Sequence, residues 1–126
     1  MNVLEIKNEV MFQTNNDIDD LPDFLPHLND YINEGYDKLV YAYAGEHLSE
    51  SKYPTLREGS DSPKLPDWTH RALADYATYM IYRNGNPQKQ QRGYAYLSLF
   101  NETRNEIRDQ GGNRGKVRNF FNIPRG

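Results

Sequence analysis

The chain has 126 residues, a formal net charge of −3, no cysteine and a hydrophobic fraction of only 37%. The lack of cysteine excludes disulfides, thiolate metal sites and cysteine nucleophiles. The sequence has no run of 18 apolar residues and no basic stretch followed by an apolar block at its start, so it predicts one soluble domain made inside the cell, with no membrane partner.

Charge is distributed unevenly along the chain. Residues 1–62 carry 13 acidic and 4 basic side chains, a net −9, whereas residues 63–126 carry 5 acidic and 11 basic side chains, a net +6. A molecule polarised in this way can bind an oppositely charged partner, or another copy of itself head to tail. The alternative is that the two halves neutralise each other within one fold.

Apolar spacing in the first half predicts two helices. A short helix is expected over residues 5–14, followed by an acidic connecting loop over about 15–26 that contains two prolines. A longer helix is expected from Pro26 to about His47, with Gly35 and Gly45 in its interior. Its apolar stripe comprises Leu28, Ile32, Tyr36, Leu39, Val40, Tyr43 and His47.

Residues 49–66 are rich in proline, glycine and serine and are predicted to form a non-helical loop. Such a long loop either contacts a partner or is a mobile surface segment. A helix is then expected to begin at residues 66–68 and to end at Asn84-Gly85, with Gly85 as its left-handed terminal residue. The buried stripe of this helix comprises Leu73, Tyr76, Ala77, Met80 and Ile81.

The last predicted helix begins with Asn86 as its cap and Pro87 at its first position, and it ends at Gly111-Gly112. Its apolar face comprises Tyr96, Leu97, Phe100, Thr103 and Ile107. Because the link between the last two helices is short, they are expected to form an antiparallel hairpin over about 67–109. The predicted fold is all-α: one bundle of about four helices over residues 1–110, followed by a tail over 111–126.

No motif in the sequence indicates catalysis or a cofactor. His27, His47 and His70 lack neighbouring ligands at metal-binding spacing and are expected on the surface or in a groove. The acidic run over 17–23 lacks the residues that a calcium loop requires, and residues 110–116 do not fit a phosphate-binding loop. The sequence therefore predicts no catalytic residue, no metal and no cofactor.

The tail combines cations with apolar side chains and contains no acid. Its candidate partner-binding residues are Arg114, Lys116, Arg118, Phe120, Phe121, Ile123 and Arg125. Docking on another protein chain is the favoured interpretation. The alternatives are a disordered terminus and nucleic-acid binding through Arg114, Lys116 and Arg118. Three tyrosines outside the apolar stripes are further candidates for an interface: Tyr41, Tyr79 and Tyr82.

Two stretches carry a resemblance to a known family. Residues 65–92 read LPDWTHRALADYATYMIYRNGNPQKQQR and residues 29–40 read NDYINEGYDKLV. Over about residues 26–110 this pattern resembles the head–tail connector (adaptor, or head-completion) family of tailed siphophages.

The resemblance implies a location in the virion, at the head–tail junction, after synthesis in the host cytoplasm. It further implies a helical subunit in a homo-oligomeric ring of about twelve copies. Such a ring binds the portal protein, docks the next tail component and lets DNA pass without sequence-specific contact. The family has no catalytic residue to transfer.

Overall fold

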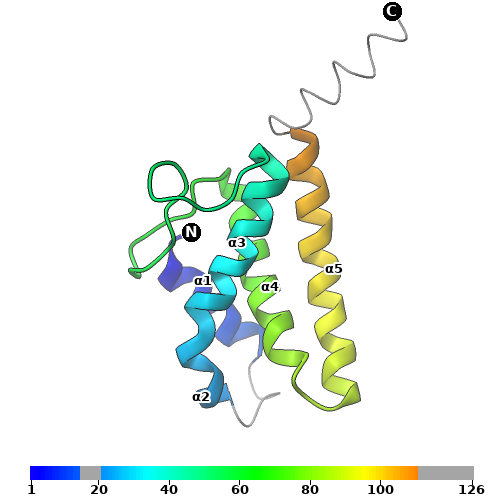
Figure 1. Ribbon diagram of the computed structural model, residues 1–126. Helices are drawn as coiled ribbons and strands as arrows, with labels where there is room; N and C mark the ends of the chain where they lie inside the picture. Colours follow the sequence, from blue (N-terminus) through cyan, green and yellow to red (C-terminus); the bar gives the residue numbers. More distant parts are fainter. Residues whose placement is uncertain (15–20, 111–126) are drawn as a thin grey trace, which may run out of the picture.

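The computed structural model describes residues 1–14 and 21–110, and its ribbon is shown in Figure 1. The helices are α1 (Val3–Gln13), α2 (Leu21–Phe24), α3 (Leu28–Ala44), α4 (His70–Tyr82) and α5 (Pro87–Gln110). The 3-10 turns η1 (Leu25–His27) and η2 (Asp67–Thr69) precede α3 and α4. Within the described ranges there is no strand, only one isolated bridge between Ser49 and Tyr53. The prediction of a small all-α bundle is confirmed.

Side-chain caps fix where two of the helices begin. Asn2 accepts a hydrogen bond from the Glu5 backbone N–H, and the Glu5 side chain accepts one from the Asn2 N–H, which forms a capping box at the start of α1. Asn86 accepts from the Lys89 N–H at 2.9 Å and caps α5, as predicted. Pro87 then occupies the first helical position, where its missing N–H costs no hydrogen bond.

Two predictions about glycines are wrong. Gly45 does not lie inside a helix but ends α3 in the left-handed region, with φ 71°, and its N–H donates to the Tyr41 carbonyl. Gly85 does not adopt that conformation. The N–H groups of Asn84 and Gly85 donate instead to carbonyls three residues earlier, so α4 ends in a tightened right-handed turn that needs no left-handed residue.

The boundaries of the first half differ from those predicted. The expected acidic loop over 15–26 is helical from residue 21, because α2 and η1 lead directly into α3. Its remaining part, residues 15–20, lies outside the described residues. The first helix covers residues 3–13 instead of 5–14, and it buries Val3, Ile6 and Val10 but leaves Met11 exposed.

The core is built around α4, which packs against α1, α3 and α5 (Figure 1). Across the predicted hairpin, the Tyr76 ring of α4 lies 4.8 Å from the Phe100 ring of α5, and Phe100 is fully buried. Leu97, expected to be buried beside Phe100, is half-buried. Gly93 allows α5 to approach closely, since a Cβ there would lie 2.9 Å from the Cβ of Tyr82.

For two histidines the structure overturns part of what the sequence predicts. His47 is exposed, as the expected surface position requires, but it is not part of the apolar stripe of α3, because it lies beyond the end of that helix, where it pairs with Asp37 at 3.0 Å. His70 is buried, in contrast to the surface or groove position expected. The His70 Nε2–H donates to the Leu65 carbonyl, and its Nδ1 accepts from the Met1 ammonium, so both ring nitrogens are satisfied.

The loop between α3 and η2 is non-helical, as predicted, but it is fastened to the bundle. The Asn33 side chain of α3 donates to the Leu56 carbonyl and accepts from the Leu56 N–H, at 2.9 and 2.8 Å. The Tyr36 hydroxyl accepts from the Lys64 N–H, and the Tyr53 and Leu65 side chains are buried in the core. This loop therefore belongs to the folded domain.

Candidate interaction surface

Of the predicted partner-binding residues, the structure describes only the three tyrosines, Tyr41, Tyr79 and Tyr82. Arg114, Lys116, Arg118, Phe120, Phe121, Ile123 and Arg125 all lie outside the described residues. Tyr79 is half-buried, with its ring 6.0 Å from that of Tyr76 and 6.4 Å from that of Tyr94.

Tyr82 is not an interface side chain. Only 1% of it is exposed, and its ring stacks on that of Tyr96 at 6.0 Å. The prediction failed because α4 is covered by three helices and buries far more than one stripe. The third tyrosine outside the stripes, Tyr41, is 55% exposed.

A shallow hollow lies where α1, α4 and α5 meet. It has a volume of about 450 Å³ and is lined by Phe12, Gln13, Arg71, Asp75, Tyr96 and Leu99. Phe12 of α1 is 76% exposed and Leu99 of α5 is 47% exposed. Large apolar side chains gathered around a depression are typical of protein-docking sites. We call this region the α1/α4/α5 surface.

A buried carboxylate lies among these apolar side chains. Asp75 is only 7% exposed, and its Oδ1 accepts a hydrogen bond of 2.9 Å from the Gln13 Nε2. The Gln13 Oε1 in turn accepts from the buried Thr78 hydroxyl. This short network holds Asp75 in place and joins α1 to α4.

Burial makes the Asp75 carboxylate costly. Desolvation raises its pKa above the usual value, and the Gln13 hydrogen bond and the positive charge of Arg71 only partly oppose this effect. Arg71 pairs with Glu9 at 2.8 Å, so the positive charge of Arg71 is partly neutralised by Glu9 and is not devoted to Asp75. A donor or cation supplied by a partner would stabilise Asp75 further.

Sequence reasoning missed both Phe12 and Asp75. Phe12 lies about 200° around α1 from the buried Val10, and so nearly on the opposite, polar side of the helix. An aromatic residue on that polar face was the signal from which the exposed position of Phe12 could have been predicted. Asp75 is the only acid within the apolar run of α4. What the sequence did not reveal is that residues more than 60 positions apart meet at one surface.

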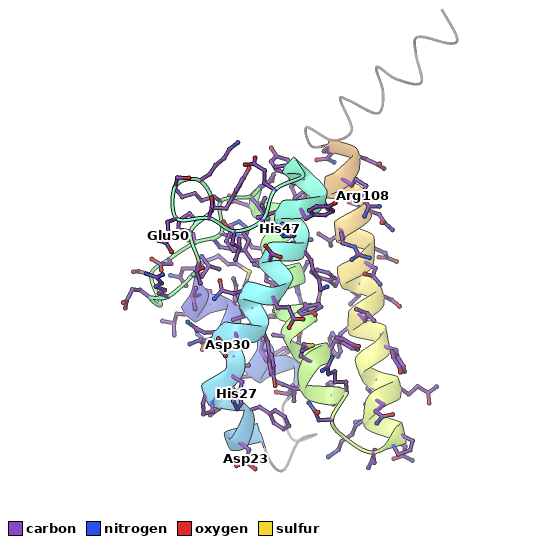
Figure 2. All side chains as sticks on the ribbon, in the orientation of Figure 1. Asp23, His27, Asp30, His47, Glu50 and Arg108 are labelled. Carbon is purple, nitrogen blue, oxygen red and sulfur yellow. The ribbon has the colours of Figure 1, made fainter. Side chains whose placement is uncertain are left out.

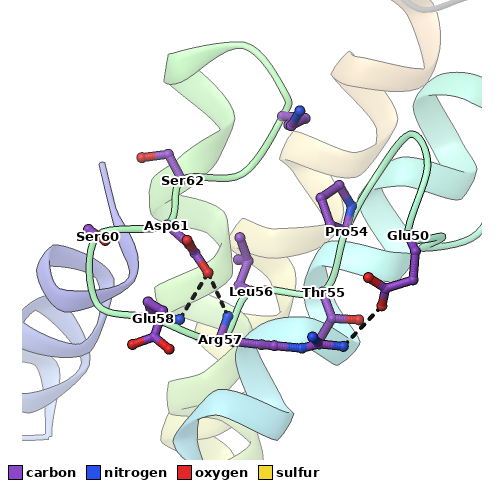
Figure 3. A pocket seen from close by; sticks show the side chains of 10 residues that line it. Glu50, Pro54, Thr55, Leu56, Arg57, Glu58, Ser60, Asp61 and Ser62 are labelled. Atoms are coloured by element: carbon purple, nitrogen blue, oxygen red, sulfur yellow. Dashed lines mark hydrogen bonds and ion pairs between the residues drawn. The ribbon is translucent and has the colours of Figure 1, made fainter.

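The long loop forms a second depression, which is lined only by residues of that loop (Figure 3). There Arg57 pairs with Glu50 at 3.0 Å, and Asp61 accepts from the N–H groups of Arg57 and Glu58, each at 2.9 Å. These backbone hydrogen bonds lower the pKa of Asp61. Arg57, Glu50 and Asp61 are thus paired within the loop, which favours a role in shaping it.

In residues 1–14 and 21–110, no three His, Asp or Glu side chains are placed to hold a metal ion together. Over the same ranges, no helix has the length and apolar character needed to cross a bilayer.

Comparisons with known proteins found no match to this chain among protein-family models, curated proteins or solved structures.

Proposed function

We propose that this chain is a structural subunit of a phage virion that assembles into a ring at the head–tail junction. In this role it binds the portal protein, extends the DNA channel and docks the next tail component. The resemblance of residues 65–92 and 29–40 to connector proteins supports the proposal. The observation that carries it is the α1/α4/α5 surface, where exposed Phe12 and Leu99 flank the buried carboxylate of Asp75.

A ring requires heterologous contacts, in which one surface of a subunit meets a different surface of the next. The α1/α4/α5 surface offers apolar area and a buried carboxylate, Asp75, which a further donor or cation would stabilise. Apolar anchors and arginines dominate the energy of protein interfaces. The basic half of a second copy supplies such groups, including the cations and phenylalanines of residues 111–126. We therefore assign the next copy as the occupant of this surface.

Electron microscopy of the full chain, alone and mixed with a candidate portal protein, tests the proposal. The expected result is a ring-shaped particle on the portal, with little affinity for double-stranded DNA. Monomers that bind double-stranded DNA in a strongly salt-dependent way would contradict it. That outcome would favour the alternative of a helical nucleic-acid-binding protein that uses Arg114, Lys116 and Arg118.

A further inference from the structure

We propose that a third hollow, between α3 and α5, binds the phosphate group of a nucleotide. This inference does not depend on ring assembly and concerns a different face of the bundle from the α1/α4/α5 surface. The hollow has a volume of about 340 Å³, which lies in the range of small-molecule pockets. Figure 2 shows two of its lining residues, His47 and Arg108, near the same end of the bundle.

Positive charge is in excess in this hollow. Lys38 of α3 and Arg104 and Arg108 of α5 line it, and in residues 1–14 and 21–110 none of the three forms an ion pair. One carboxylate, Asp37, also lines it. Asp37 is already engaged, because it pairs with His47 Nδ1 at 3.0 Å and accepts from the Leu48 N–H at 2.9 Å. Lys38 Nζ lies 6.0 Å from the centroid of the Tyr76 ring, and Arg108 donates a hydrogen bond of 3.4 Å to the Asn105 side chain. Neither contact neutralises a charge, so the three cations can still pair with an anion.

The two arginines are arranged for one ligand. They are four residues apart on α5, so they lie one above the other on the same face of the helix. The Arg104 Nε is buried and has no hydrogen-bond acceptor in the described part of the chain. A buried donor without an acceptor costs free energy, and such groups in folded proteins call for an explanation. An oxyanion held by the guanidinium groups provides the missing acceptors, since arginine matches phosphate geometry.

An aromatic wall beside the cations favours a nucleotide over a bare anion. The Tyr41 and His47 rings stack with their centroids 5.1 Å apart and an interplanar angle of 22°, and both residues line the hollow. Tyr41 is 55% exposed, so much of its side chain remains accessible next to the charges. Aromatic rings beside arginines recognise bases and phosphates together. The ligand class is thus a phosphate carrying a planar base, either as a free mononucleotide or as part of a single strand.

Titration calorimetry of the full chain with AMP, adenosine, inorganic phosphate and a ten-nucleotide single strand tests this site. Arg108→Gln, at an exposed position, and Arg104→Gln are each expected to weaken AMP binding by about tenfold, the loss typical of a charge-assisted contact. Arg83→Gln, an exposed arginine outside the hollow, is the matched control and is expected to leave binding unchanged. Adenosine, which lacks the phosphate, is expected to bind far more weakly than AMP, and inorganic phosphate is expected to compete with AMP.

The two sources of phosphate are separated by comparing AMP with the single strand. Binding of AMP or of the single strand that depends on Arg104 and Arg108 supports the site. The ligand with the higher affinity shows whether the phosphate comes from a free mononucleotide or from a strand. The proposal is overturned if neither binds, or if Arg104→Gln and Arg108→Gln bind as the unchanged chain does. Melting curves of the variants verify that they are folded, and Arg108→Gln preserves the test if Arg104→Gln does not fold.

Discussion

Gln13 of α1 donates a hydrogen bond of 2.9 Å to Asp75 of α4, across 62 positions of sequence. This contact places a buried carboxylate between two exposed apolar side chains, Phe12 and Leu99. The surface that we assign to assembly therefore forms only when the bundle folds, because its hollow is lined by residues of both α1 and α4.

Replacing Asp75 with asparagine is expected to change how stability depends on pH. Burial raises the folded-state pKa of Asp75, so its contribution to stability is fully present below the unfolded pKa and is lost as pH rises through the raised pKa. The asparagine side chain keeps an oxygen that can accept from Gln13 but does not titrate. The stability of Asp75→Asn relative to the unchanged chain should therefore increase with pH across that window.

Urea denaturation of both proteins from pH 3 to 7, roughly the range in which carboxyl groups titrate, measures this difference. A difference that stays constant with pH would show that Asp75 is ordinarily solvated in the folded protein.

Phe100→Ala is expected to destabilise the fold by about 3–5 kcal/mol, because Phe100 is fully buried against Tyr76 and its removal leaves a cavity. Thermal and urea denaturation provide the measurement. Leu99→Ala, at the preceding position but half exposed, is the control and should cost much less. A melting temperature for Phe100→Ala close to that of the parent would place Phe100 outside the core.

Asn33→Ala is expected to loosen the long loop. The Asn33 side chain satisfies both the N–H and the carbonyl of Leu56, and leaving such groups unpaired costs about 1–3 kcal/mol. Hydrogen exchange at the Leu56 amide should accelerate markedly. Asn29→Ala removes a single bond of 3.3 Å to the Arg57 carbonyl and should have a smaller effect. Equal exchange in both variants would mean that the core side chains alone hold the loop.

The four longer helices could be predicted because each has an apolar stripe, as with Ile6 and Val10 in α1 or Phe100 and Ile107 in α5. The Asn86-Pro87 start of α5 was likewise predicted from local chemistry. What failed depends on tertiary packing. Tyr82 lies outside the stripe of α4, yet it is buried because α4 is enclosed by three neighbouring helices. Gly85 does not adopt the predicted left-handed conformation, because backbone hydrogen bonds to Ile81 and Tyr82 close a right-handed turn at the end of α4.

The candidate site was harder to predict than the fold. Phe12, Asp75 and Leu99 come from three helices, and no spacing in the sequence shows that they meet. The predicted tail residues, from Arg114 to Arg125, lie outside the described residues, so their role stays a prediction.

Removing residues 111–126 tests that role. The shortened chain, ending at Gln110, is expected to fold and melt like the full chain but to lose ring completion or portal binding, because the basic and aromatic side chains are then missing from the contact between copies. Thermal denaturation and electron microscopy give the two readouts. If the shortened chain unfolds, residues 111–126 are part of the core of their own domain. If assembly is unchanged, these residues make no contact that assembly requires.

The most direct test of the assembly surface is the mass of particles formed with the candidate portal by Phe12→Ser, measured by mass photometry. Phe12 is 76% exposed, so its replacement should leave the melting temperature unchanged. Tyr94→Ser, at a 58% exposed aromatic that does not line the hollow, is the matched control. Our account predicts that Phe12→Ser abolishes the ring-sized particle while Tyr94→Ser retains it. Rings of unchanged mass and yield with Phe12→Ser would contradict the assignment of this surface.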